Sequence, residues 1–418
     1  MAFPSLWAET APAPPVRASL EESLRCDVLV IGGGFQGLSA ALHLAEAGTD
    51  VVLLEAKEPG FGASGRNGGQ VIPGLKDDPD TLDRLWGPEA SAFAGDTADT
   101  LFALVARLGI DCDAVQGGWI QAGNRQVHLP ALQARLRQWQ VRGVACDWLD
   151  AAEMAQVTGA RGFLGGWRDP RAGRVHPLKL AQGLAKAAEA AGVRLFTRSP
   201  VERLDRSGAG WRARLSSGAE VTAERVIVAS NVYTPPRLDP QLARATVPAN
   251  SFQVATAPLS DAQLARILPG GEVVSETRRV GTYFRIGPQN RLMVGGRGSF
   301  ADPQGPADFA RIEAELAALF GTGFEITHRW FGRVGMTPDH RMRLCVPAPG
   351  LLTATGFNGR GVALSVALGK AMAAHVAKGA PLPIPPSSEI PTLPFHGLHR
   401  IYGGIAIHYY RLRDALDR

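Results

Sequence analysis

The chain has 418 residues, of which 45% are hydrophobic and 20% are charged, and its formal net charge is +5. This length is sufficient for two domains, and the composition is ordinary for a globular protein. The positive charge comes from scattered arginines, without a Lys/Arg run or a basic stripe interleaved with aromatic residues, so we expect no nucleic-acid partner.

The four cysteines, Cys26, Cys112, Cys146 and Cys345, lie far apart and lack metal-ligand spacing. They predict buried thiols in a reducing compartment, with neither a metal site nor a disulfide framework. The first 25 residues lack the apolar core of a signal peptide, and no run approaches the roughly 18 apolar residues of a membrane span. We therefore expect a cytoplasmic protein without a transmembrane segment.

Residues 1–24 contain several prolines, which predict an extended leader that lies on the surface or is partly disordered. Residues 28–31 then form an apolar run of strand length. A G-x-G-x-x-G turn (Gly32, Gly34, Gly37), a helix-length segment and a second apolar strand ending at Glu55 follow in order. Phosphate would bind the free N–H groups at the helix start, and the carboxylate would accept from ribose hydroxyls. This order of elements predicts a dinucleotide site.

Residues 60–70 contain five glycines together with Ser64, Arg66, Asn67 and Gln70. A nicotinamide-binding unit would normally continue into another crossover helix, whereas this segment is a polar loop rich in backbone donors. We expect it to line a second large ligand surface. The alternative is a flexible surface loop.

The middle of the chain alternates between predicted helices and strands. The helices are expected at residues 81–108, 129–141 and 177–192, and the strands at 193–204, 211–215 and 225–231. Ligands lie beyond the carboxyl ends of strands in a parallel sheet, so Ala229 and Ser230, at the end of the last strand, are candidate contacts.

Residues 246–331 predict an antiparallel sheet with one helix at 308–319. Tyr283 and Arg285 lie on one of its strands and are candidate substrate contacts. At most one of the two is expected to reach the pocket. His176, and His340 near Asp339, are expected to be structural.

A second glycine block lies between a strand at 351–354 and a helix at 362–376. It reads Gly356-Phe357-Asn358-Gly359-Arg360-Gly361-Val362. The helix start can stabilise the negative charge that a flavin gains near N1 and O2 on reduction. Arg360 either adds to this effect or faces solvent. The alternative for the whole block is a strand–helix turn without a ligand.

Residues 31–55, 60–70 and 356–361 together resemble the D-amino-acid oxidase/glycine oxidase superfamily of FAD-dependent amine oxidoreductases, and most of all its gamma-glutamylputrescine oxidase branch. The resemblance implies FAD, two domains and oxidation of a C–N bond. It also implies that Val201 touches adenine and that Gln70 contacts the flavin.

Departures from the sarcosine-oxidase branch of the same superfamily refine this interpretation. Gly332 stands where that branch attaches FAD to a cysteine, so non-covalent FAD is expected. Met293 stands where that branch has a lysine that promotes reaction with oxygen, which argues against fast oxidase activity. Pro73 and Ala363 replace the two basic residues that grip a substrate carboxylate, so a simple N-methyl amino acid is not favoured.

The predicted fold class is α/β, with a discontinuous Rossmann-like FAD domain and an α+β substrate domain on an antiparallel or mixed sheet. The FAD domain is expected at 25–90, 160–236 and 328–395, and the substrate domain at 91–159 and 237–327. Residues 396–418 are expected to form a helix or tail that either docks on the protein's own surface or contacts a membrane surface or a partner.

The expected catalytic residues are Gln70, Tyr283 and Arg285. The expected cofactor-binding residues are Gly32, Gly34, Phe35, Gln36, Gly37, Glu55, Ala56, Ser64, Gly65, Arg66, Asn67, Gly68, Gly69, Gln70, Val201, Ala229, Ser230, Gly332, Gly356, Phe357, Asn358, Gly359, Arg360, Gly361 and Val362. The expected partners are an amine substrate (a polyamine, a gamma-glutamyl-amine or an amino acid) and O₂ or another electron acceptor.

The expected reaction is hydride transfer to FAD followed by hydrolysis of the resulting imine. The alternatives are an N-alkyl- or D-amino-acid oxidase or dehydrogenase, a nicotinamide-dependent oxidoreductase, and a flavoprotein whose FAD is structural or regulatory.

Overall fold

The apolar run that ends at Ile31 forms strand β1 (Leu24–Ile31) in the structure, a computed structural model that describes residues 3–417. The last four residues of β1 are all buried, as expected for a strand covered on both faces. β1 pairs in parallel with β2 on one side and with β11 on the other. The order of this first sheet is β17 (Arg343–Ala348), β18 (Leu351–Thr355), β11 (Glu220–Val228), β1, β2 (Val51–Leu54) and β8 (Arg194–Phe196).

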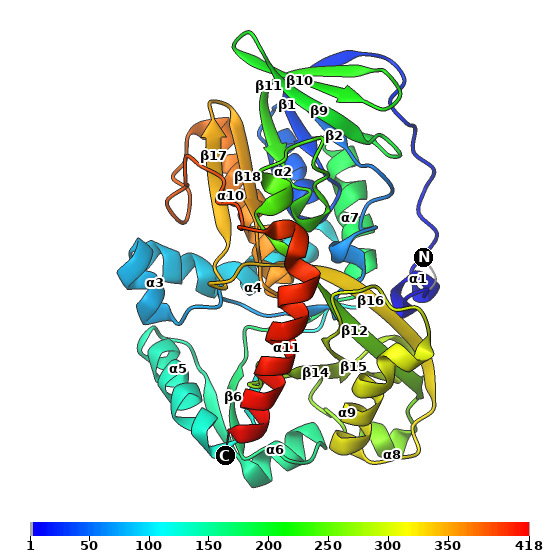
Figure 1. The fold of residues 1–418 in the computed structure, drawn as a ribbon, viewed down its shortest axis with the longest axis vertical. Coiled ribbons are helices and arrows are strands. Elements are labelled where there is room, and N and C mark those ends of the chain that lie inside the picture. The colour runs from blue at the N-terminus through cyan, green and yellow to red at the C-terminus, as the bar shows by residue number, and fades with distance from the viewer. Residues whose placement is uncertain (1–2, 418) are drawn as a thin grey trace.

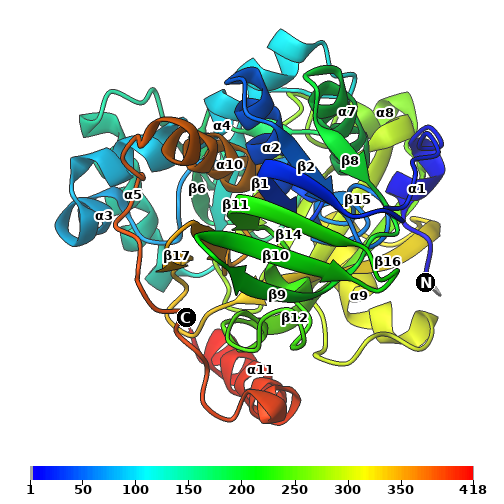
Figure 2. The ribbon, with the colours of Figure 1, turned by 90° about the horizontal axis from the view of Figure 1, so that it is seen from above.

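Helices cover one face of the first sheet and a hairpin covers the other. Figure 2 shows α2, α7 and α10 on one side of β1 and β11, with β9 and β10 on the other. The covering elements are α2 (Phe35–Glu46), α4 (Pro88–Leu108), α7 (Pro177–Ala190), α10 (Gly361–Lys378), β9 (Val201–Ser207) and β10 (Gly210–Leu215). Two hydrophobic clusters, one on each face, stabilise this three-layer arrangement.

The second sheet lies below the first in Figure 1 and is antiparallel except where β13 pairs with β4. Its order is β16 (Ile326–Met336), β12 (Val247–Pro258), β15 (Arg291–Arg297), β14 (Thr282–Ile286), β13 (Val273–Glu276), β4 (Trp119–Gly123), β6 (Gly165–Asp169) and β5 (Asp147–Asp150). Its helices are α5 (Leu129–Val141), α6 (Ala151–Thr158), α8 (Asp261–Leu264) and α9 (Ala310–Phe320). The expected fold class is confirmed.

Three elements belong to a different domain from the one expected for their residues. β6 and β16 belong to the second sheet, although residues 160–236 and 328–395 were assigned to the FAD domain. Helix α4 packs in the hydrophobic cluster of α2, although most of it falls in the expected substrate segment 91–159. Contacts between residues far apart in the sequence decide which sheet or layer each of these elements joins. Such contacts produce no recognisable local sequence pattern at the domain boundary.

Two expected elements are each divided in two. The helix expected at 81–108 is α3 (Pro79–Trp86) followed by α4, because Gly87 has a φ of 90° and Pro88 has no N–H to continue the first helix. The strand expected at 193–204 is interrupted before Val201: β8 pairs with β2, whereas β9 pairs with β10 in the hairpin of the same sheet.

The N-terminal segment is partly inserted into the protein, which corrects the expectation of a surface leader. Helix α1 (Leu6–Thr10) buries Leu6 and Trp7 completely, and the Ser5 hydroxyl caps it by accepting from the N–H of Ala8. The indole of Trp7 donates to the carbonyl of Asn67 at 2.9 Å, so the segment contacts the glycine-rich loop. Met1 and Ala2, also part of the expected leader, lie outside the described residues.

The C-terminal segment forms α11 (His399–Leu416), which runs beside the second sheet in Figure 1. It docks on the protein's own surface through Gly403, Ile407 and Asp414, the first of the two expected arrangements. Its outer face carries exposed apolar side chains: Ile401, Tyr402, Ile405, Tyr409, Leu412 and Leu416. Among the described helices, none is long and apolar enough to cross a membrane.

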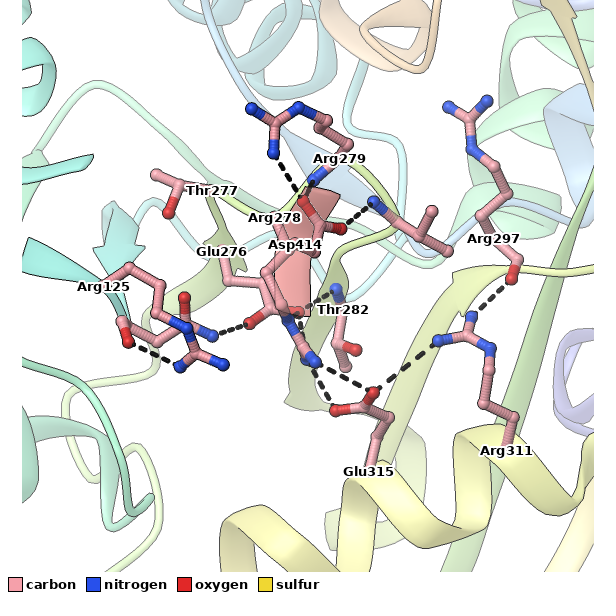
Figure 3. A network of polar contacts seen from close by, with 12 residues as sticks. Arg125, Glu276, Thr277, Arg278, Arg279, Thr282, Arg297, Arg311, Glu315 and Asp414 are labelled. Atoms are coloured by element: carbon pink, nitrogen blue, oxygen red, sulfur yellow. Dashed lines mark hydrogen bonds and ion pairs between the residues drawn. The ribbon is translucent and has the colours of Figure 1, made fainter. Parts of the chain in front are cut away.

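Asp414 ties α11 to the loop between β13 and β14, as Figure 3 shows. One carboxylate oxygen accepts from the backbone N–H of Arg279 at 3.1 Å and from its guanidinium at 3.0 Å. The other oxygen accepts from the N–H of Val280, which is buried, at 3.0 Å. A helix from the end of the chain therefore determines the conformation of this loop.

We predict that Asp414→Ala destabilises the loop, because two backbone N–H groups lose their acceptor at a cost of about 1–3 kcal/mol. Hydrogen exchange of residues 277–282 should become faster. The control is Arg413→Ala, which removes an exposed side chain of the same helix. Equal exchange in the two variants would show that Asp414 does not hold the loop.

Candidate active site

The turn between β1 and α2 has the geometry of a phosphate cradle. Gly32 has a φ of 114°, and a Cβ there would lie 2.9 Å from the carbonyl oxygen of Ala229. At Gly37 a Cβ would collide with the carbonyl oxygen of Gly32. Gly34 is the N-cap of α2, and as a glycine it has no side chain that could accept a hydrogen bond from the first N–H groups of the helix. The helix N-terminus thus presents donors and a positive dipole end to a ligand.

Glu55 follows β2 and stands beside this turn. One carboxylate oxygen accepts from the N–H of Gly33 at 2.7 Å, and the other accepts from the N–H of Lys57 at 2.8 Å. Burial raises the pKa of the Glu55 carboxyl, whereas the hydrogen bonds from these N–H groups oppose that shift. The side chain is fixed in place with lone pairs left for hydroxyl groups.

The polar loop 60–70 is held from several sides, so the alternative of a flexible surface loop is wrong. Arg66 is 9% exposed, and its guanidinium donates to the carbonyl of Phe331 at 2.7 Å. The carbonyl of Arg66 in turn accepts from the side chains of Gln253 and Trp330. Asn67 closes the loop on itself by donating to Ser64 at 2.9 Å.

The second glycine block connects β18 to the start of α10. Gly356 and Asn358 have φ values of 75° and 52°. The Asn358 side chain accepts from the N–H of Thr337 at 2.8 Å and donates to the carbonyl of Gly356, which fixes the turn. The guanidinium of Arg360 lies 4.6 Å from the ring centre of Trp119, so it does not face bulk solvent.

One continuous cavity of about 630 Å³ joins these parts. It extends from Gly32 and Glu55, past the polar loop and the second glycine block, to Trp119 and Gln121 of the second sheet. A dinucleotide and a small substrate can therefore occupy one space between the two sheets.

Most of the expected site residues line this cavity. Five of them do not: Gly37, Gly65, Gly69, Gly356 and Arg285. The four glycines act through the backbone, because a side chain at any of them would meet neighbouring atoms of the turns.

The three expected catalytic residues differ in their environments. Gln70 is held by the second sheet, since its amide donates to Val274 and accepts from Ser275. Tyr283 lines the cavity, and its hydroxyl lies 2.8 Å from that of Ser251. Burial raises the pKa of the Tyr283 phenol, which therefore stays neutral.

Arg285 does not line the cavity, and the residue is 2% exposed. The guanidinium donates to the carbonyls of Gly69 at 2.9 Å and Val175 at 2.8 Å, and more weakly to Gly68. It also lies over the ring of Trp7. Arg285 thus supports the polar loop from behind.

The two histidines lie outside the cavity lining. His176 caps α7 by accepting from the N–H of Lys179 at 3.2 Å, and burial lowers its pKa to about 4. Burial also lowers the pKa of His340. Met293 is buried against Trp7 and Trp330, away from the cavity lining, so its identity is a weak guide to oxygen reactivity.

Lys76 and Arg297 also line the cavity, and sequence reasoning missed them. Lys76 precedes two aspartates and Pro79, a pattern typical of an exposed helix start. Arg297 ends β15 in a glycine-rich stretch without a motif. Neither position carried a signal in the sequence.

No cysteine lines the cavity. All four thiols are buried, and burial raises the pKa of Cys26, Cys112 and Cys146 to about 12 and that of Cys345 to about 11. Gly332 lines the cavity beside Arg66. Within residues 3–417, no group of three or more His, Cys, Asp or Glu side chains is arranged to hold a metal ion.

Several known proteins are similar to this chain over most of its length. Gamma-glutamylputrescine oxidoreductase of Escherichia coli (strain K12) is 32% identical over 409 residues, 95% of each chain. The probable oxidoreductase OrdL of Rhizobium meliloti (strain 1021) is 32% identical over 98% of this chain and 97% of its own. Glycine oxidase from Geobacillus kaustophilus has a similar fold, with a TM-score of 0.73 at 22% identity, over 86% of this chain and 96% of its own.

The family model for FAD dependent oxidoreductases, DAO, matches residues 27–375. This range includes the β1–α2 turn, the polar loop and the second glycine block, the three parts that form the cavity wall. The chain belongs to the DAO family of FAD-dependent oxidoreductases.

Proposed function

We propose that the protein oxidises the C–N bond of an amine, with FAD bound non-covalently between the two sheets. The observation that carries the proposal is the single cavity that contains both glycine-rich turns and continues to Trp119 and Gln121. The 32% identity with a gamma-glutamylputrescine oxidoreductase supports an amine as substrate. The class of amine is a polyamine, a gamma-glutamyl-amine or an amino acid.

Each part of the cavity has a defined role in this proposal. The start of α2 would hold the pyrophosphate, and Glu55 and Val201 would contact the adenosine. The N–H groups at the start of α10 would stabilise negative charge on the isoalloxazine. When bound, FAD supplies a two-electron acceptor for hydride from the carbon attached to nitrogen. The resulting imine would be hydrolysed to a carbonyl compound and a smaller amine.

The side chains of the protein position the substrate and exclude water from it. Tyr283 is a neutral phenol fixed by Ser251, and Gln70 is fixed by β13 and β14, so both present rigid walls to the substrate. Such positioning supplies a large share of rate acceleration without a strong acid or base. Electrons then pass to O₂ or another acceptor.

A second candidate is oxidation of a D-amino acid. The observation that favours it is a D-amino acid dehydrogenase of Methylobacterium sp. (strain 4-46), which is 29% identical over 83% of this chain and 94% of its own. Both candidates use the same cavity and cofactor, and they differ in the substrate alone.

We predict that acid denaturation releases intact FAD from the wild-type protein, because Gly332 and the buried cysteines offer no attachment point.

Gly34→Val should prevent FAD retention, because a side chain there occupies the space of the pyrophosphate and also crowds Ser64. The control is Gly305→Val, in extended backbone with open space around it. Released flavin is quantified by chromatography. Flavin that stays on the polypeptide would contradict non-covalent binding, and full flavin content in Gly34→Val would contradict the assigned turn.

We predict that an amine bleaches the bound flavin under anaerobic conditions. The panel contains polyamines, gamma-glutamylated amines, and D- and N-alkyl amino acids, and stopped-flow absorbance near 450 nm (about the flavin maximum) measures reduction. Reduction by NADH or by a hydroxy acid, and by no amine, would refute the proposal. Slow reoxidation in air would identify the protein as a dehydrogenase.

A further inference from the structure

Exposed apolar side chains are concentrated near the end of the chain. More than half of the large hydrophobic side chains that are exposed among residues 3–417 lie between positions 395 and 416. On α11 they recur every three or four residues and therefore share one side of the helix: Ile401, Tyr402, Ile405, Tyr409, Leu412 and Leu416. We call these six side chains the outer stripe. Single exposed apolar residues are normal on a protein surface, whereas a continuous stripe marks a contact surface.

The opposite side of α11 is packed on the protein. Ile407 and Gly403 are buried, and a Cβ at Gly403 would lie 2.6 Å from the ring of Phe300, so the helix rests closely on the segment after β15. Asp414, also on this side, holds the loop between β13 and β14. Figure 2 shows α11 projecting at the edge of the protein. The packed side thus fixes the orientation of the helix and directs the outer stripe towards solvent.

The charges beside the outer stripe are positive. The helix carries three exposed arginines: Arg400, Arg411 and Arg413. The first two pair with no carboxylate among residues 3–417. The acidic residues of segment 395–417 are Asp414 and Asp417, and both contact Arg279. These carboxylates are engaged by the protein, so the charges that α11 presents to solvent are those of its arginines.

A cavity of about 360 Å³ lies along α11, between this helix, the segment after β15 and helix α9. Arg400 and Arg411 line it from α11, and Arg311, which lies 3.7 Å from Glu315, lines it from α9. Its one carboxylate, that of Asp308, accepts from two backbone N–H groups of its own turn. Arg400 and Arg411 each precede a residue of the outer stripe, so the cavity adjoins the stripe. Cationic and apolar groups therefore lie next to each other, as an anionic headgroup and its acyl chains require.

We propose that the outer stripe, together with Arg400 and Arg411, is a docking surface for an anionic phospholipid bilayer, on which α11 lies parallel to the membrane plane. The helix has 18 residues and is about 27 Å long. Its apolar side would enter the boundary of the acyl chains, while the arginines extend to the phosphates and the tyrosines lie at headgroup level. The helix is not apolar enough to cross a membrane, so this binding is peripheral.

A second copy of the chain fits this surface less well. Two outer stripes packed against each other would bring the arginines of both helices together, and neither helix presents a free carboxylate there. An anionic bilayer supplies the negative charge that the helix lacks. Charge complementarity therefore selects the membrane surface as the occupant.

The first test is flotation of the holoenzyme with phosphatidylcholine vesicles, prepared with and without phosphatidylglycerol. Binding should be at least tenfold stronger with phosphatidylglycerol, and high salt should weaken it because salt screens the arginines. The double variant Ile405→Ser/Leu412→Ser should bind at least tenfold more weakly, since it removes apolar groups from the stripe. Arg400→Gln/Arg411→Gln should remove the preference for phosphatidylglycerol.

The matched controls are on helix α5. Val141→Ser removes a side chain that is 85% exposed, and Arg137→Gln removes an exposed arginine. Both controls should bind vesicles as the wild-type protein does. All the substituted side chains are exposed, so we expect every variant to keep its FAD content and melting temperature, and both are measured first.

The second test measures the depth of the helix in the bilayer. All four native cysteines are buried, so Ile405→Cys provides an exposed thiol for a nitroxide label. Addition of phosphatidylglycerol vesicles should make this label more accessible to O₂ and less accessible to a water-soluble nickel chelate. The same label at Val141→Cys should keep its accessibility to both reagents. This comparison separates insertion of the outer stripe from adsorption by charge alone.

Several results would overturn the proposal: no binding to phosphatidylglycerol vesicles, equal binding of the Ile405→Ser/Leu412→Ser variant, equal binding to neutral vesicles, or a label at position 405 that stays accessible to nickel. A dimer that this double variant dissociates, without vesicle binding by the wild-type protein, would assign the surface to a second copy and overturn it as well. Amine oxidation is measured without vesicles, so the failure of membrane docking leaves the proposed function standing.

Discussion

The cofactor cavity depends on the buried guanidinium of Arg285. It comes from the second sheet, yet its donors go to carbonyls of Gly68 and Gly69 in the polar loop and of Val175 before α7. Carbonyl oxygens carry only partial charge, so burying a guanidinium against them is costly unless several act together. Trp7 adds a ring over the cation. One side chain of the second sheet thereby connects the leader, the loop and the segment before α7.

This connection explains why a glycine-rich loop can be ordered. Glycine loses more conformational entropy on folding than any other residue, and loop 60–70 contains five. Buried donors from Arg66, Trp330 and Gln253 complete the restraint on the loop. Elsewhere in the lining of the cavity, Arg278 and Arg279 are paired with carboxylates.

The sequence predicted the parts whose signal is local. The turn from Gly32 to Gly37 and the position of Glu55 just after β2 are set by steric limits within a few residues, and both line the cavity or shape it. The sequence did not predict the burial of Trp7 or the membership of β16 in the second sheet, because contacts across the whole chain decide them. Lys76 was missed for the same reason: its place in the cavity lining depends on the fold and not on the neighbouring sequence.

The most direct measurement of the central claim is the FAD dissociation constant of Arg285→Leu, taken with hydrogen exchange of residues 60–70. The substitution removes the side-chain donor from the carbonyls of Gly69 and Val175, and the Gly69 carbonyl keeps only the N–H of Val175. Arg203→Leu provides an exposed control. We expect FAD affinity to fall at least tenfold, about 1.4 kcal/mol, with faster exchange in the loop. Wild-type FAD affinity together with unchanged loop exchange would contradict the account.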